Sequence, residues 1–151
     1  MNNKFLILIT ALIFMFTMIA YFILNPSYQR SLEAKYYFET GSYKEAYLIA
    51  SEAFSMDVYN RMASTIMAQS KTSLKYVKYN DTAKSYMKKI NTIANKDAIS
   101  DADKAKIKIM CEIMIDSYIK LAPSVITDKD LVQETKNYYK NFEKLLEKVT
   151  Q

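Results

Sequence analysis

The sequence predicts an all-α protein in which one transmembrane helix is followed by a helical-hairpin bundle of about five to six helices. Glycine occurs once and proline twice among the 151 residues, whereas an average protein contains roughly 7% Gly and 5% Pro. So few chain-breaking residues favour long helices joined by short connections. In addition, residues 5–24 carry no charge, and apolar residues recur at helical spacing through the remainder of the chain.

Residues 5–24 form the clearest element, an uninterrupted run of 20 residues without a charged side chain. A helix of this length spans about 30 Å, the thickness of the hydrocarbon core of a bilayer. The competing interpretation is a cleaved signal peptide, whose apolar region usually covers about 7–15 residues and ends at small residues. Tyr21 and Phe22 stand where those small residues are needed. We therefore expect an uncleaved anchor over residues 1–25 and a soluble α-helical domain over residues 26–151.

The charges that flank the anchor are nearly balanced, because Lys4 precedes it and Arg30 and Lys35 follow it. The positive-inside rule therefore discriminates poorly between the two orientations. A very short N-terminal tail before a long apolar run is typical of a signal anchor. We expect a single-pass inner (plasma) membrane protein with a cytoplasmic N-terminus and an extracytoplasmic (periplasmic) C-terminal domain.

The first helical hairpin is marked by its breaks and caps. Pro26 ends the anchor because proline cannot continue its hydrogen bonding. Gly41 ends the first soluble helix, since glycine tolerates positive φ. Ser42 and Glu45 then read as a capping box that opens the second helix. So short a connection predicts two antiparallel helices.

Similar signals divide the rest of the chain. Asp57 is the expected N-cap of the next helix, and Asn80 and Asp81 allow a break within it. Ser100 and Asp103 resemble a capping box with Asp in place of Glu. The expected helices after the anchor are residues 28–40, 43–55, 58–79, 82–94, 101–122 and 128–149.

The last two of these helices differ in pattern. Residues 101–122 are apolar almost all round, and a helix of that kind belongs in the middle of a bundle. Residues 128–149 carry one apolar stripe opposite a row of lysines, so this helix either packs its stripe on the bundle or forms a coiled-coil seam with another chain. The lysines are Lys136, Lys140, Lys144 and Lys148.

Small, aromatic and glycine residues follow a spaced pattern through residues 32–58. They are Ala34, Tyr37, Gly41, Tyr43, Ala46 and Ala53. This pattern resembles the tetratricopeptide repeat (TPR), a 34-residue helix-turn-helix unit, although Val58 stands in place of the usual closing proline. A second, degenerate repeat over residues 61–95 is an open alternative. The resemblance implies a TPR-like domain that binds a peptide or a helix within a multiprotein assembly.

The chain offers little for catalysis. It contains no His, no Trp and a single Cys, which removes the commonest general base and most zinc sites. Cys111 lies among Ile and Met residues and is expected to be a buried, inert thiol. Asp97, Asp101 and Asp103 lack the Gly and Glu of a calcium-binding loop and are better explained as acids at a helix start. We expect no enzyme activity, cofactor, metal, small-molecule substrate or nucleic-acid partner.

These features favour a membrane-tethered protein–protein interaction scaffold, or an accessory subunit of a bacterial envelope complex of the flagellar motor, secretion or pilus type. The alternative is a chaperone-like or regulatory domain that transiently binds exported polypeptides at the membrane. The formal net charge of +5 is explained mainly by an ordinary solvated surface. The first hairpin and the last helix are the expected docking surfaces. The candidate partner-binding residues are Tyr36, Tyr43, Tyr47, Tyr138 and Phe142.

Overall fold

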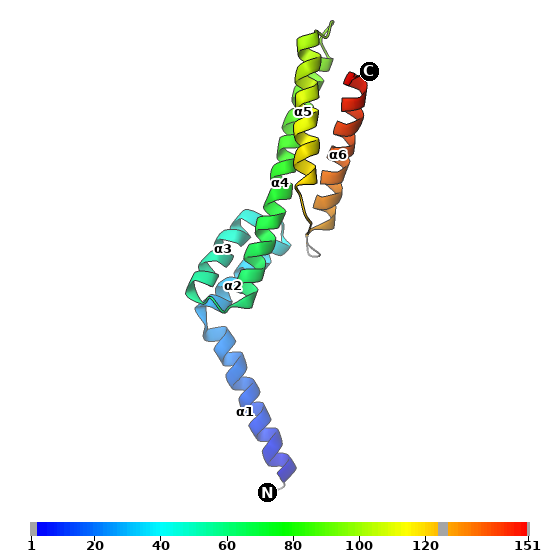
Figure 1. Cartoon of the computed structure of the whole chain (residues 1–151). Coiled ribbons are helices and arrows are strands. Elements are labelled where there is room, and N and C mark those ends of the chain that lie inside the picture. The colour runs from blue at the N-terminus through cyan, green and yellow to red at the C-terminus, as the bar shows by residue number, and fades with distance from the viewer. Residues whose placement is uncertain (1–2, 124–126, 151) are drawn as a thin grey trace. The chain divides into compact units, whose positions relative to one another are not determined.

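A computed structural model describes residues 3–123 and 127–150, and across them the regular structure is entirely helical (Figure 1). This confirms the predicted all-α class with an apolar helix at the N-terminus. The helices are α1 (Asn3–Leu24), α2 (Pro26–Glu39), α3 (Tyr43–Met56), α4 (Arg61–Ala94), α5 (Asp101–Ile119) and α6 (Lys129–Thr150).

The chain divides into two compact units, and each is described by itself. The first unit, Met1–Lys71, contains α1, α2, α3 and the first turns of α4. The second unit, Thr72–Gln151, contains the rest of α4 with α5 and α6.

Helix α1 is the one described helix that is long and apolar enough to cross a membrane, over Lys4–Leu24. Its large apolar side chains are exposed. The hydroxyls of Thr10 and Thr17 donate to backbone carbonyls of the preceding turn, at 2.9 Å to Ile7 and 2.8 Å to Phe14. Because each Thr satisfies its own polar group within the helix, neither interrupts the span.

Helices α2 and α3 form a hairpin that is closed by Gly41. Gly41 has φ +80°, its N–H donates to Phe38 O at 3.2 Å, and the N–H of Ser42 donates to Tyr37 O at 2.9 Å. These two bonds form a Schellman motif. They confirm Gly41 as the end of the first soluble helix.

The predicted capping box at Ser42 is wrong. Ser42 is the residue before α3, but its side chain makes no capping hydrogen bond. The reason is local, since its backbone N–H completes the Schellman motif and its ψ of 63° departs from the extended conformation that an N-cap usually adopts.

The hairpin packs through small side chains. Ala34 of α2 and Ala46 and Ala50 of α3 are 0% exposed, and they form one buried cluster with Ile66 of α4. Alanines at these positions let the helix backbones approach closely. The tetratricopeptide resemblance itself stays a prediction.

Asn60 is the N-cap of α4, so the prediction of Asp57 for that role is wrong. The Asn60 Oδ1 accepts from the N–H of Ala63 at 3.1 Å. Asp57 instead ends α3, and its carboxylate accepts from the N–H of Tyr59 at 2.9 Å. The chain needs three more residues after Asp57 to turn before α4 begins.

The predicted break at Asn80 and Asp81 is also wrong, because α4 runs without interruption from Arg61 to Ala94. Asn80 is 2% exposed. Its amide donates to Glu134 at 2.9 Å, and its carbonyl oxygen accepts from the hydroxyl of Thr135 at 2.7 Å. An asparagine whose polar groups are satisfied by another helix does not compete with its own backbone. The segment where a second repeat needs its turn is therefore helical.

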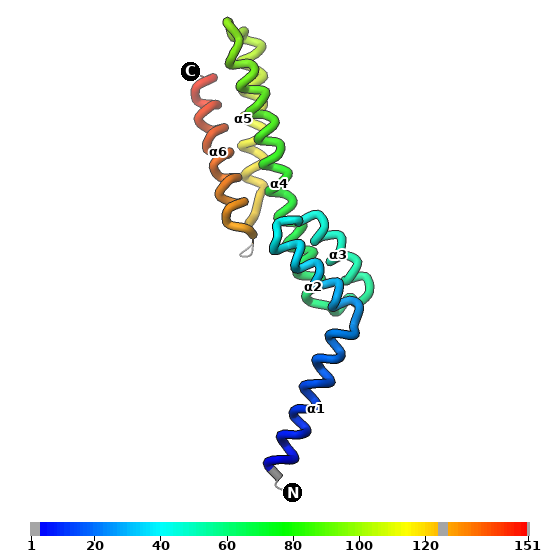
Figure 2. Tube along the Cα trace, turned by 180° about the vertical axis from the view of Figure 1, so that it is seen from behind, coloured from blue at the N-terminus to red at the C-terminus, as the bar shows by residue number. Residues whose placement is uncertain are grey.

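The core of the second unit takes residues from three helices, which lie side by side in both views (Figures 1 and 2). Helix α6 packs its apolar stripe on this core, with Phe142 fully buried and Tyr138, Leu145, Leu146 and Val149 partly buried. This confirms the prediction that the stripe packs on the bundle. The buried core residues are Tyr79, Ala83, Ile90, Ile107, Cys111, Met114 and Phe142.

Helix α5 begins as predicted, but it does not lie in the middle of a bundle. The hydroxyl of Ser100 accepts from the N–H of Asp103 at 3.1 Å, as expected of an N-cap. In contrast, Ile109, Ile113 and Ile119 are 55%, 44% and 71% exposed. Only the side of α5 that bears Ile107, Cys111 and Met114 is buried, because a three-helix unit covers each of its helices on one side.

Candidate functional site

The five predicted partner-binding residues have very different surroundings. Tyr36 is 65% exposed on α2, and Tyr47 is half-buried on α3. Tyr43 is 7% exposed and packs edge-on against Phe38, with ring centroids 5.5 Å apart. Tyr138 packs partly buried against the core of the second unit, and Phe142 is 0% exposed within it.

Burial therefore corrects two of these assignments. Tyr43 and Phe142 belong to the interior of their units, where bulky aromatic rings fill space between helices. Three of the five residues belong to the first unit and two to the second.

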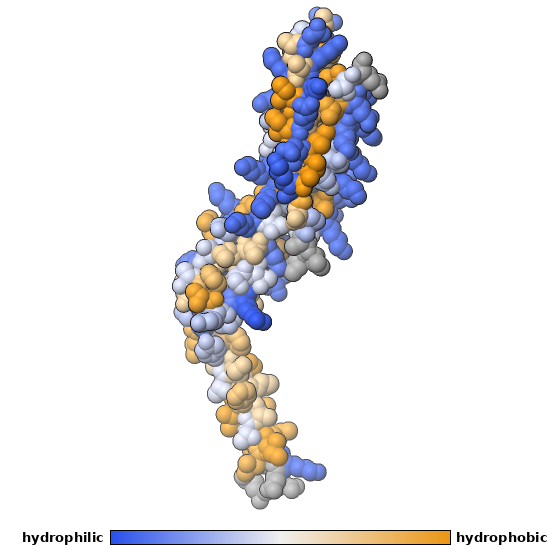
Figure 3. All heavy atoms as spheres, in the orientation of Figure 1, coloured by the Kyte–Doolittle hydropathy of each residue, from blue (hydrophilic) through white to orange (hydrophobic). Residues whose placement is uncertain are grey.

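A groove of about 590 Å³ runs between α4 and α5 in the second unit. Its apolar residues are Tyr86 and Ile93 from α4 and Ile109, Met110 and Ile113 from α5. Ile109 and Ile113 are the exposed isoleucines described above, and Figure 3 shows apolar atoms on the surface of this helix beside hydrophilic ones. The second unit thus leaves a solvent-open apolar surface along two helices.

Lysines line this groove. Lys89, Lys96 and Lys106 belong to it, and the ammonium of Lys89 lies 5.5 Å from the centre of the Tyr86 ring. A smaller hollow of about 160 Å³ between the same two helices adds Lys75 and Lys78. Alkyl stems on an apolar floor with charged heads in water are the usual arrangement of lysine at such a surface.

Asp103 is the acidic residue in the groove lining, and it is already paired. The ammonium of Lys96 lies 2.8 Å from its carboxylate and holds the pKa of that carboxyl below its usual range. This ion pair joins the connection after α4 to the first turn of α5. The remaining lysines of the lining give the groove a positive rim.

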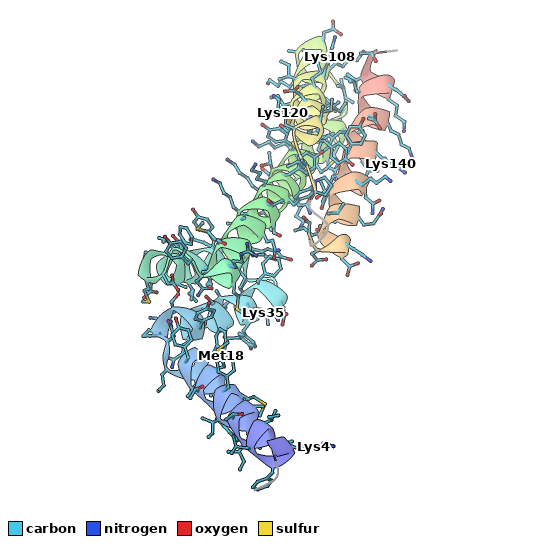
Figure 4. All side chains as sticks on the ribbon, turned by 60° about the horizontal axis from the view of Figure 1, so that its bottom comes forward. Lys4, Met18, Lys35, Lys108, Lys120 and Lys140 are labelled. Carbon is cyan, nitrogen blue, oxygen red and sulfur yellow. The ribbon has the colours of Figure 1, made fainter. Side chains whose placement is uncertain are left out.

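The excess positive charge of the chain is concentrated in the same unit. Residues 72–151 contain 15 lysines and 11 acidic residues, a balance of +4, whereas residues 1–71 contain 6 basic and 5 acidic residues. Lys108 of α5 and Lys120 at its C-cap (Figure 4) pair with Glu112 and Asp116 of α5, at 3.9 and 2.6 Å. The net positive charge of the chain therefore lies mainly in the unit that carries the groove.

Cys111 is 0% exposed on the core side of α5, as predicted, and burial raises the pKa of its thiol to about 11. Among residues 3–123 and 127–150, no group of three or more Asp, Glu, Cys or His side chains is placed to hold a metal ion.

We expect iodoacetamide to alkylate Cys111 roughly 100-fold more slowly at pH 8 in the folded protein than in the urea-unfolded chain. Raising the pKa from 9.0 to about 11 lowers the thiolate fraction by about that factor, and the thiolate is the nucleophile. Because the folded pKa is the higher one, the stability from keeping this thiol neutral is complete below about pH 9 and is lost as the pH rises toward 11. Mass spectrometry of timed samples measures both rates, and equal rates would contradict the burial of the thiol.

No model of a known protein family, no curated protein and no solved structure matches this chain.

The groove was missed from the sequence, although its signal was present. The nearly all-round apolar pattern of residues 101–122 predicts a central helix, whereas the structure leaves one side of α5 open. Isoleucines on the side of α5 away from the core, facing lysine-bearing turns of α4, are the feature that marks an open groove instead.

Proposed function

We propose that this protein is a membrane-tethered interaction protein whose α4–α5 groove binds an acidic amphipathic helix of another protein. The observation that carries the proposal is the apolar groove with its lysine rim. Helix α1 supplies the tether in this proposal, and the helical domain acts as a docking subunit of an envelope complex on the extracytoplasmic side of the membrane.

The dimensions of the groove suit a helix. Its lining runs from Tyr86 to Ile93 on α4, with Lys96 two residues beyond that helix, and from Asp103 to Ile113 on α5, which is about 15 Å of α5 at 1.5 Å per residue. That length accommodates roughly three turns of a docked helix. Apolar side chains at i, i+3, i+4 and i+7 of such a helix would contact Ile93, Ile109 and Ile113, as in other helix-in-groove complexes.

Charge decides which class of helix is favoured. The two hollows together present five lysines and a single aspartate, and that aspartate is paired with Lys96. Glu or Asp residues that flank the apolar stripe of a partner would meet this rim, whereas lysines at those positions would be repelled. Complementary charge of this kind contributes to specificity and to the rate of association.

Two synthetic amphipathic peptides test the proposal directly. Both carry the same Leu and Ile stripe, one flanked by Glu and the other by Lys, and their binding to the full chain in zwitterionic lipid nanodiscs is followed by fluorescence anisotropy. We expect the acidic peptide to bind and Ile113→Glu to weaken it at least tenfold, because a charge then occupies the apolar floor.

Ile119→Glu is the matched control, since Ile119 lies on the same helix, is 71% exposed and is absent from the groove lining. Charge reversal offers a second comparison, in which Lys106→Glu weakens the acidic peptide and Lys140→Glu, at an exposed position on α6 (Figure 4), does not. Equal binding of the two peptides, or equal losses in Ile113→Glu and Ile119→Glu, would refute the groove as the docking site.

A further inference from the structure

Three large apolar side chains are exposed within four residues where α3 ends and the turn to α4 begins. Met56, Val58 and Tyr59 are 51%, 60% and 88% exposed. A turn in contact with water alone is usually built from small and polar residues. Three large side chains at one turn therefore indicate a surface that something apolar covers.

Polar contacts hold this turn against the start of α2, directly after α1. The amide of Asn60 donates to the hydroxyls of Ser27 and Ser31, both at 2.8 Å. The hydroxyl of Ser27 in turn donates to Ala53 O at 2.8 Å. All four residues are buried, so the network fixes the turn beside the junction of α1 and α2.

The end of α1 and the turn also share a cavity. This cavity has a volume of about 500 Å³. It is lined by Tyr21, Asn25 and Pro26 from the α1–α2 junction and by Met56 and Asp57 from the turn. Since the apolar span of α1 ends at Leu24, the turn lies at the level where that span ends. Figure 1 shows the α3–α4 turn at the end of the hairpin that adjoins α1.

The apolar surface continues onto α2. A hollow of about 400 Å³ is lined by Phe22 and Ile23 of α1, Tyr28 and Leu32 of α2, and Met62 of α4. The rings of Phe22 and Tyr28 meet edge to face, with centroids 4.8 Å apart. Aromatic rings at the end of a membrane span are typical of the interface between headgroups and acyl chains.

The charges near the turn suit the headgroup region. The carboxylate of Asp57 is half-buried and turned back onto the N–H of Tyr59, at 2.9 Å. Glu52 is paired with Arg30 at 3.3 Å, and Arg61 is an exposed cation one residue after the N-cap. Phosphate groups of lipids attract such a cation, and the carboxylate of Asp57 is held back on the turn by the N–H of Tyr59.

We propose that the α3–α4 turn, residues 56–60, is a second membrane contact that seats Met56, Val58 and Tyr59 in the interfacial layer of the bilayer crossed by α1. The proposal rests on the membrane insertion of α1 proposed above. It adds a second contact with the bilayer to the one that α1 makes. Two contacts on one rigid hairpin hold the first unit close to the membrane surface instead of letting it pivot about Asn25.

Single labels placed in the full chain test this contact. Cys111 is the only cysteine, so Cys111→Ala leaves a background in which Tyr59→Cys carries an environment-sensitive fluorophore. Thr40→Cys is the control, because Thr40 is exposed at the far end of α2, about 20 Å along that helix. Ile13→Cys reports insertion of α1. The protein is reconstituted in vesicles of phosphatidylcholine and phosphatidylglycerol.

We expect lipids with a nitroxide near the headgroup to quench the label at residue 59 several-fold more strongly than the label at residue 40, and aqueous iodide to do the reverse. A deep nitroxide should quench the label at residue 13. Random orientation of the protein in the vesicles affects residues 40 and 59 alike, so their ratio is informative. Val58→Cys provides an independent reporter in case a label at residue 59 disturbs the turn.

The outcomes separate the two proposals. In one outcome, deep lipids quench the label at residue 13, but iodide quenches labels at residues 58 and 59 as strongly as the label at residue 40. This outcome overturns the second contact and leaves the anchor intact. That result would assign the exposed turn to a protein partner. A label at residue 13 that no lipid quenches overturns both the insertion of α1 and the contact that depends on it.

Discussion

Replacing Phe142 with alanine is expected to lower the free energy of unfolding of the α4–α6 unit by about 3–5 kcal/mol. Phe142 is 0% exposed and lies in the core to which α4, α5 and α6 all contribute. Truncation removes the transfer free energy of the ring and leaves a cavity that helices pinned by Asn80 and Thr135 cannot close. Urea unfolding in detergent micelles, followed by far-UV circular dichroism, measures the loss.

Tyr36→Ala is the control for this substitution, because Tyr36 is also aromatic but 65% exposed. It should change the unfolding free energy by about 0.5 kcal/mol or less. Similar losses in the two variants would show that Phe142 does not hold the three helices together, and the described packing of α6 would then be in error.

Asn60→Ala is expected to destabilise the first unit by about 2–4 kcal/mol. The substitution removes the N-cap of α4, and it withdraws the donor that buried Ser27 and Ser31 share. Buried hydroxyls that lose a partner cost more than the bond itself is worth, since water cannot replace it. The same urea titration measures the effect, with a tryptophan introduced at exposed position 48 of α3 as a local probe.

Two companion variants separate the contribution of the N-cap from that of the buried hydrogen bonds to this loss of stability. Asn60→Ser keeps an oxygen that can cap α4, and it should recover roughly 1 kcal/mol of the loss. Asn91→Ala, at an exposed position of the same helix, should leave stability unchanged or slightly higher, because alanine is the better helix former. If Asn60→Ala were no more harmful than Asn91→Ala, the Asn60 network would be irrelevant to the fold, and the position of the α3–α4 turn would lose its support.

The proposals place two different surfaces of the chain in contact with two different neighbours. In the first unit, the end of α1 and the exposed residues of the α3–α4 turn face the bilayer. In the second unit, the groove between α4 and α5 offers an apolar floor with a lysine rim to a helix. The Glu-flanked peptide and the label at residue 59 test these contacts separately, so one can fail while the other stands.

Sequence alone determined the features that depend on neighbouring residues. The apolar run of residues 5–24 predicts α1, Gly41 predicts the end of α2, and Ser100 predicts the start of α5. In each case the deciding interaction lies within a few residues, such as the Schellman bonds around Gly41 or the bond from the N–H of Asp103 to Ser100. Such signals are readable without knowing what the helix will pack against.

Only the tertiary structure decided the features that depend on distant partners. Asn80 continues a helix instead of breaking it because Thr135, 55 residues away, satisfies its side chain. Asn60 caps α4 because Ser27 and Ser31 of another helix take its amide. Likewise, nothing local distinguishes the buried Ile107 from the exposed Ile109 and Ile113. The groove exists because α6 covers one side of the α4–α5 pair, and the number of helices available to cover a face is settled only when the chain packs.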